Sequence, residues 1–151
     1  MSAPISADRS LILQGLRLLV VDDDLDTVDL AAIILDSHGA ETIKATSAAE
    51  ALIHWQLHPH LLISDLAMPG QDGYWLLDQI KQQSPSVTEV LAIAWTACSV
   101  PQEKERALVA GYQQFLEKPV DPACLVAIVA NLLGRPVREL HDANGEFSEE
   151  K

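Results

Sequence analysis

The sequence has few positively charged residues and no long apolar run, and each shortage excludes a class of protein. It contains 10 Lys and Arg residues against 22 Asp and Glu, which gives a formal net charge of -12. Proteins that bind a nucleic acid backbone use clustered Lys and Arg, so direct DNA binding is not expected. No apolar segment approaches the ~20 residues of a membrane span, and the polar start at Met1 lacks the character of a secretory signal. We therefore expect a cytoplasmic protein that does not bind membranes.

Cysteine is also scarce, since the 151 residues include only 2. Cys98 and Cys124 belong to a chain that is 48% hydrophobic, which is enough apolar content for one domain with its own core. Such a domain needs no disulfide. Both thiols are therefore expected to be reduced and unpaired.

Short apolar segments alternate with helical patterns along the chain, which predicts an α/β domain with a parallel sheet. Strands are expected at 17–21, 40–45, 61–65, 90–95 and 112–116, and helices at 26–38, 47–55, 74–80, 102–110 and 121–133. Trp75 falls off the apolar stripe of its helix. It is expected to point toward solvent, where it would hint at a contact surface.

Four of these strands run into polar residues that suit a reactive site. The polar residues at the strand ends are Asp22, Asp23, Asp24, Asp65, Thr96 and Lys118. Because parallel strands all point the same way, these ends meet at the carboxyl edge of the sheet, where such sheets bind ligands. Facing carboxylates repel one another unless a cation lies between them. Oxygen ligands favour a hard divalent ion, which at cellular concentrations is Mg²⁺.

The same acidic turn argues against a nucleotide or flavin site. Those sites place Gly, Ser or Thr amides at the first turn between strand and helix, where they hold a phosphate. The segment from Asp22 to Asp26 would repel one. A histidine metal site is also not expected. His54 and His58 share a helix face, but Pro59 breaks the helix before His60, which favours a solvated helix end.

Four motifs together resemble the receiver domain of two-component response regulators. They are Val20-Val21-Asp22-Asp23, the segment from Ser64 to Gly73, Trp95-Thr96-Ala97 and Phe115-Leu116-Glu117-Lys118-Pro119. The resemblance covers about Leu16 to Gly134 and is closest in style to receivers of hybrid histidine kinases. It implies a doubly wound, five-stranded parallel sheet of order 2-1-3-4-5. We expect an N-terminal arm (1–14), a receiver domain (15–134) and a flexible acidic tail (135–151).

The resemblance also implies the role of each residue at the rim. Asp65 is the expected phosphoacceptor. Mg²⁺ is expected on Asp23, on Asp65, on the backbone carbonyl of Ala67 and, through water, on Asp22, whereas Asp24 lies one step too far along. Lys118 and Thr96 would stabilise the phosphoryl group, Phe115 would be the switch residue, and the bond between Lys118 and Pro119 would be cis.

Four residues depart from the family's usual pattern. Ala67 and Cys98 offer no amide or carboxylate to orient a hydrolytic water, so we expect slow loss of the phosphoryl group. Phe115 stands where Tyr is commoner, so burial alone must favour its inward position. Trp95 is bulkier than the usual aliphatic residue and is interpreted as a core side chain that can report on the site by fluorescence.

The sequence therefore indicates a single-domain phosphorelay protein and not an enzyme. Its expected partners are a sensor histidine kinase or a histidine phosphotransfer protein, and a downstream protein. A homodimer through the fourth helix, fifth strand and fifth helix is possible. A hydrolase would need a second acid at Ala67. A pseudo-receiver scaffold and a receiver fragment of a hybrid kinase remain open, although the start at Met1 and the acidic tail favour a stand-alone protein.

Overall fold

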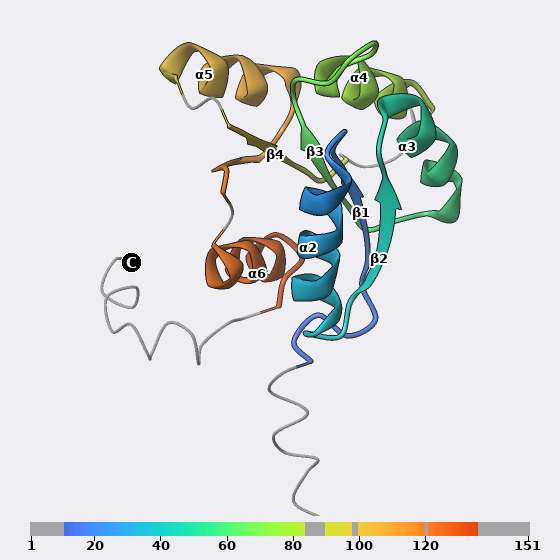
Figure 1. The fold of residues 1–151 in the computed structure, drawn as a ribbon, viewed down its shortest axis with the longest axis vertical. Helices are drawn as coiled ribbons and strands as arrows, with labels where there is room; N and C mark the ends of the chain where they lie inside the picture. The colour runs from blue at the N-terminus through green and yellow to red at the C-terminus, as the bar shows by residue number, and fades with distance from the viewer. Residues whose placement is uncertain (1–10, 84–89, 98–99, 120, 136–151) are drawn as a thin grey trace, which may run out of the picture.

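The computed structural model describes residues 11–83, 90–97, 100–119 and 121–135, which form a sheet covered by helices on both faces (Figure 1). In chain order the elements are β1 (Arg17–Val21), α2 (Leu25–Asp36), β2 (Glu41–Ala45), α3 (Ala48–His54), the 3-10 helix η1 (Trp55–Leu57), β3 (Leu61–Asp65), α4 (Gly73–Gln83), β4 (Ala92–Thr96), α5 (Pro101–Ala110), β5 (Gln114–Glu117) and α6 (Pro122–Leu132).

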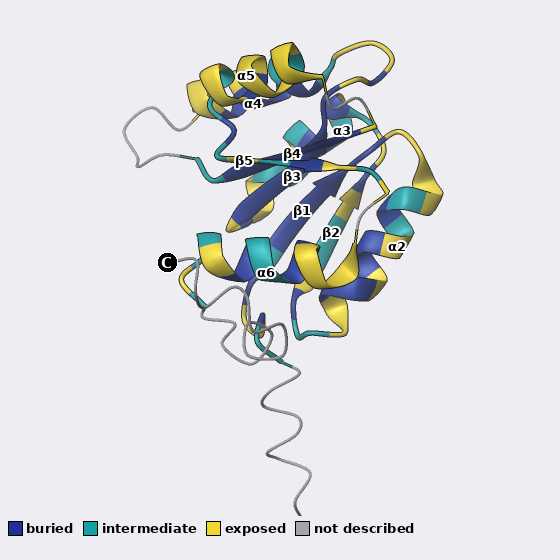
Figure 2. Cartoon of the chain, turned by 90° about the vertical axis from the view of Figure 1, so that its left-hand side faces the viewer, coloured by how far each residue is buried: buried dark blue, intermediate teal, exposed yellow. Residues whose placement is uncertain are grey.

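The sheet is parallel and its strand order is β2-β1-β3-β4-β5, which confirms the predicted topology. In the central register Val20 lies opposite Ile63 and Ile63 opposite Ile93. Strands β3 and β4 are buried along their whole length (Figure 2). A strand covered on both faces must be apolar on both sides, which explains why these segments read as continuous apolar runs.

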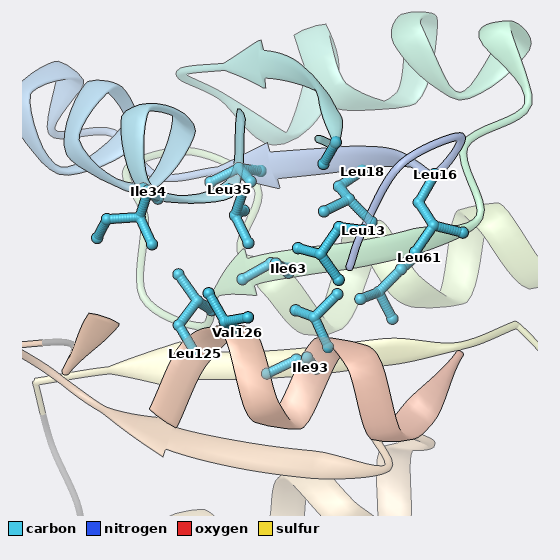
Figure 3. Close-up of a cluster of buried hydrophobic side chains, with 14 of the residues drawn as sticks. Leu13, Leu16, Leu18, Ile34, Leu35, Leu61, Ile63, Ile93, Leu125 and Val126 are labelled. Carbon is cyan, nitrogen blue, oxygen red and sulfur yellow. The ribbon is translucent and has the colours of Figure 1, made fainter. Parts of the chain in front are cut away.

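Two hydrophobic clusters lie on opposite faces of the sheet. The first contains the buried sides of α2 and α6 (Figure 3). The second contains buried residues of α3, α4 and α5. Both clusters draw side chains from alternate positions of the same strands, so Leu18 and Val20 face one cluster while Leu19 and Val21 face the other.

Helices α3 and α6 each begin at a side-chain cap. The Asp121 carboxylate accepts a hydrogen bond from the Cys124 amide (3.2 Å) at the start of α6. At α3 the Ser47 hydroxyl accepts from the Glu50 amide (3.0 Å), and the Glu50 carboxylate accepts from the Thr46 amide (2.8 Å). This differs from a standard capping box, because Glu50 reaches the residue before the cap. Those contacts lower the pKa of Glu50, chiefly through the Thr46 amide.

Several element boundaries differ from the prediction by one or two residues. Strand β4 begins at Ala92, because Val90 and Leu91 precede the paired segment, and it extends to Thr96. Strand β5 begins at Gln114. The predicted break at 84–86, Cys98 and all but the first residue of the predicted tail lie outside the described residues. Among the described part of the chain, no helix is long and apolar enough to span a membrane.

The prediction for Trp75 was wrong. Its side chain is half-buried and packs against the second cluster. Helix α4 packs between its neighbours α3 and α5 on one face of the sheet, and its buried residues include Leu76, Leu77 and Ile80. A broad apolar face of this kind extends past the strict helical stripe and covers part of Trp75.

The last residues of the predicted N-terminal arm pack against the domain. Leu13 is fully buried in the first cluster, and its amide donates to the His38 carbonyl (2.8 Å). Arg135, just past α6, donates to the carbonyl oxygens of Ile12 and Gln14, each at 3.0 Å. The two ends of the described domain are therefore held together at the edge where β1 begins.

We predict that Leu13→Ala lowers the free energy of unfolding by about 2–4 kcal/mol, because it leaves a cavity in the first cluster. Leu30→Ala is the matched control, since Leu30 is 52% exposed and should cost less than about 1 kcal/mol. Urea denaturation measures both. Equal stability of the two variants would show that residues 11–14 contribute nothing to the core.

Candidate functional site

The polar residues predicted for the rim meet at the carboxyl edge of the sheet. Asp22 follows β1 directly, Asp65 is the last residue of β3, Thr96 is the last of β4, and Lys118 follows β5. Each position is set by where a strand ends, because parallel strands finish at the same edge. The structure therefore brings together residues that are up to 96 positions apart in the sequence.

Three carboxylates form the acidic part of the site. Each of Asp22, Asp23 and Asp65 offers an oxygen within 4.8 Å of the others. Asp22 is 1% exposed and Asp65 is 6% exposed, whereas Asp23 is exposed. Within the described ranges no other cluster of His, Cys, Asp or Glu has this spacing. An all-oxygen donor set with one open side fits a hard divalent cation.

Asp24 does not belong to this cluster. Its carboxylate accepts hydrogen bonds from the Asp26 amide (3.1 Å) and the Thr27 hydroxyl (3.0 Å), and so caps α2. The Asp24 amide in turn donates to the Asp22 carboxylate (2.9 Å). The cap of α2 thus orients Asp22, while Asp24 uses its own oxygens on the helix.

Lys118 supplies the positive charge of the site. Its ammonium donates to the Asp22 carboxylate and lies 3.3 Å from an Asp65 oxygen. Burial acts to lower the pKa of Lys118, but the hydrogen bond to Asp22 and the charges of Asp65 and Asp22 outweigh it and raise the pKa. The ammonium is therefore held in its charged form. The Lys118 amide donates to the Thr96 carbonyl (2.9 Å), and the bond to Pro119 is cis.

The Asp65 carboxyl has a raised pKa. Burial is the largest cause, the charge of Lys118 opposes it, and the neighbouring Asp22 adds to it. Two buried carboxylates sharing one ammonium are not fully neutralised, so further positive charge is favoured here. The site can therefore accept a cation, and its lysine can pair with an anionic group.

The loop that follows Asp65, residues 66–72, is called the acceptor loop below. The Ala67 amide donates to the Asp65 carboxylate (3.2 Å). The loop is closed at its base, where the Gly73 amide donates to the Leu66 carbonyl (3.1 Å). A Cβ atom at Gly73 would lie 2.4 Å from the Asp65 carbonyl oxygen. Only glycine permits the backbone to approach this closely.

Trp95 is a core side chain, as interpreted from the sequence, and it also contacts the site. It is fully buried, and its indole N–H donates to the Val21 carbonyl (3.3 Å). The Lys118 ammonium lies 5.5 Å from the centre of its ring. The indole thus touches the residue before Asp22 and lies beside the lysine.

Thr96 and Phe115, the two expected switch residues, lie on neighbouring strands. Thr96 is 4% exposed at the end of β4. Phe115 is half-buried, lies opposite Ala94 in the register, and packs against the second cluster. Beside the site is a surface cavity of about 330 Å³, lined by Thr27, Leu30, Trp95, Ala97, Lys118 and Pro119.

Two of the histidines contact other protein groups. His60 accepts a hydrogen bond from the Arg17 amide at Nδ1 (3.0 Å), and His54 lies 3.4 Å from the Glu50 carboxylate. Cys124 has an exposed free thiol, and partial desolvation by neighbouring groups, followed by the charge of Asp121, raises its pKa.

Sequence reasoning missed two residues next to the site. Ser64 is fully buried, and its hydroxyl donates to the Asp65 carbonyl (2.9 Å). The Tyr112 hydroxyl donates to the Gly73 carbonyl (2.7 Å). A tyrosine or serine inside an apolar strand region is a usable signal, because a buried hydroxyl needs a partner. The sequence does not reveal which partner.

Comparison with known sequences points to one family. A model of the response regulator receiver domain matches residues 18–130. An uncharacterized 14.6 kDa protein of Leptolyngbya boryana is 40% identical over 118 residues, which cover 78% of this chain and 89% of that protein. The response regulator Rre1 of Synechocystis sp. is 34% identical over 124 residues, covering 81% of this chain and 53% of that protein. The chain spans about half the length of the named regulators that it matches.

Solved structures give the same result. A CheY-like receiver domain protein from Methanospirillum hungatei superposes with a TM-score of 0.71 and 28% identity, over 79% of this chain and 94% of that one. CheY of Borrelia burgdorferi, in a complex with CheX, BeF3 and Mg²⁺, superposes with a TM-score of 0.72 and 27% identity, over 80% of this chain and 90% of that one.

Proposed function

The chain belongs to the response regulator receiver domain family, and from this premise we propose that Asp65 is the residue that accepts the phosphoryl group. As a receiver domain it is a module of two-component signal transduction and not a classical enzyme. The observation that carries the proposal is the pairing of Lys118 with both Asp22 and Asp65 at the carboxyl edge of the sheet. This pairing brings a nucleophile, the Asp65 carboxylate, next to a positive charge, the Lys118 ammonium.

The proposed reaction transfers a phosphoryl group from a nitrogen of a donor histidine to an oxygen of Asp65. An Asp65 carboxylate oxygen attacks the phosphorus of a phosphohistidine, the new O–P bond forms as the N–P bond breaks, and the donor imidazole leaves with the electron pair and takes up a proton. Such a transfer depends on positioning and charge stabilisation. Lys118 pairs with one phosphoryl oxygen, and the Thr96 hydroxyl donates to another. The product is an acyl phosphate on Asp65.

The acidic cluster fits Mg²⁺ as the ion that accompanies this reaction. Asp23, Asp65 and the Ala67 carbonyl would hold it directly, and Asp22 would hold it through water. Bound there, it supplies positive charge opposite the phosphoryl oxygens. The likeness to Borrelia CheY, which was solved with BeF3 and Mg²⁺, supports this assignment.

The proposed partners are a sensor histidine kinase or a histidine phosphotransfer protein as donor, and a protein that recognises the phosphorylated form. Borrelia CheY forms a complex with CheX, which supports signalling through protein contacts. A homodimer through α5, β5 and α6 is one such contact. A non-phosphorylated scaffold, or a receiver piece of a hybrid histidine kinase, is the alternative, and the first experiment below separates the scaffold from a working receiver.

The proposed switch links Thr96 to Phe115. Thr96 moves toward the new phosphoryl oxygen, and the Phe115 ring enters the space that Thr96 leaves. Phe115 has no hydroxyl, so burial alone favours its inward position. Phe115 is half-buried in this structure, so an inward position would bury more of its ring. Helix α5, strand β5 and helix α6 would then shift together between two arrangements.

We predict a single phosphoryl adduct on the protein after treatment with acetyl phosphate and Mg²⁺, detected by intact mass. Asp65→Asn should abolish it. Asp24→Asn is the matched control, because it removes an acidic group next to the site while Asn remains a good helix cap. An adduct that persists in Asp65→Asn, or none in the unmodified protein, would contradict the proposal and favour a scaffold.

We predict that the acyl phosphate lasts for minutes or longer, because the exposed Ala67 side chain cannot orient a water molecule. Ala67→Asn should shorten this lifetime by about tenfold, since it introduces an amide beside the phosphoryl group. Ala49→Asn, which alters an exposed alanine of α3, should leave the lifetime unchanged. A lifetime of seconds in the unmodified protein would refute the prediction.

Amide hydrogen exchange tests the switch. On phosphorylation the exchange rates in α5, β5 and α6 should change by about fivefold or more, the scale of a typical coupling between two states. Those in α3 should stay the same, and Asp65→Asn treated identically should show no change anywhere. Unchanged rates in α5, β5 and α6 of the phosphorylated protein would rule out this route of transmission.

A further inference from the structure

Tyr112 places a hydroxyl in the middle of the second hydrophobic cluster. Its side chain is 1% exposed, and its hydroxyl donates to the Gly73 carbonyl at 2.7 Å. The Ser64 side chain is its other polar neighbour. The same cluster contains Ala92, Ala94 and Ala107, and these small side chains leave space for a large ring.

The partner of that hydroxyl is the end of the acceptor loop. Gly73 closes the loop through its amide, which donates to the Leu66 carbonyl. Its backbone also lies against Asp65, since a Cβ there would be 2.4 Å from the Asp65 carbonyl oxygen. That oxygen accepts the Ser64 hydroxyl (2.9 Å). A continuous set of buried contacts thus runs from Tyr112 through Gly73 to the backbone of Asp65.

From these contacts we infer that Tyr112 is a positioning residue for the acceptor loop. By holding the Gly73 carbonyl, its hydroxyl fixes the base of the loop and thereby the directions of the Asp65 carboxylate and the Ala67 carbonyl. The inference rests on the proposed function, because these two groups are the proposed ligands of Mg²⁺. Tyr112 touches neither the ion site nor the phosphoryl group and acts through the backbone alone.

The burial of the hydroxyl supports a specific role. A phenylalanine would fill the same space without bringing a polar group into an apolar cluster, which is costly unless the group is hydrogen-bonded. The amide of Tyr112 donates to the Ala107 carbonyl at the end of α5 (3.1 Å). The same residue therefore joins the acceptor loop to α5.

Tyr74 provides a matched control. Its hydroxyl donates to the Glu103 carboxylate (2.7 Å), and the Arg106 guanidinium lies 4.0 Å from the centre of its ring. It joins α4 to α5, as Tyr112 does, but its hydroxyl donates to Glu103 of α5 and not to the Gly73 carbonyl that closes the acceptor loop. Removing either hydroxyl weakens the packing of these helices, and only the loss at Tyr112 should reach the ion site.

The test compares Tyr112→Phe with Tyr74→Phe in ¹⁵N-labelled protein, with Mg²⁺ as the added ligand. Amide shifts of Asp23 and Ala67 report binding, and exchange of the Gly73 and Ala67 amides in Mg²⁺-free protein reports loop order. We expect Tyr112→Phe to raise the Kd for Mg²⁺ by about three- to tenfold, the effect of losing one buried hydrogen bond. The exchange of both amides should accelerate by a similar factor. Tyr74→Phe should change neither.

The outcomes separate the inference from its premise. A Kd and loop exchange in Tyr112→Phe that match the unmodified protein would overturn the inference and leave the proposed function intact. Equal changes in both variants would also overturn it, because they would show a general loss of stability. If the unmodified protein does not bind Mg²⁺ at all, the proposed function and the inference fail together. Ser64→Ala, which removes the donor to the Asp65 carbonyl, should raise the Kd as well, and an unchanged Kd there would count against this set of contacts.

Discussion

The pairing of one ammonium with two buried carboxylates is the constraint on which the site depends. Lys118 reaches both Asp22 and Asp65, so it connects the ends of β1, β3 and β5. One positive charge cannot balance two negative ones, and burial, with a smaller contribution from the charge of Asp22, raises the pKa of Asp65 although Lys118 opposes the shift. The rim is therefore arranged to receive a cation, and the lysine becomes available to an anion when that cation shares the carboxylates.

The sequence predicts the sheet and the composition of the rim because both depend on local patterns. A strand that is covered on both faces reads as an apolar run, and the polar residue that ends each run marks the carboxyl edge of the sheet, so Asp22, Asp65 and Lys118 could be placed from sequence alone. The starts of β4 and β5 were each predicted two residues too early, because the segments that resemble strands begin before the pairing does. Pairing is decided by the neighbouring strand and not by the residue itself.

Three features depended on contacts between distant residues and could not be predicted. Leu13 reads as part of a polar arm and becomes core only because α2, β1 and α6 leave a space for it. Trp75 lies off the helical stripe but is partly covered at the side of α4. Tyr112 was assigned to a strand, and its importance comes from Gly73, which is 39 positions away. The packing of the surrounding elements determines the burial of Leu13 and Trp75, and the need of a buried hydroxyl for a hydrogen-bond partner determines the contact of Tyr112.

The contacts of Arg135 with Ile12 and Gln14 bring the first and last described segments to the edge of the sheet opposite the acidic rim. Entry and exit of the polypeptide are thus adjacent, and both are about a strand's length away from the chemistry. A unit with this geometry can be inserted into, or joined to either side of, another protein while its acidic rim stays accessible. Arg135, which lies far from the acidic rim, holds the two ends of this unit together.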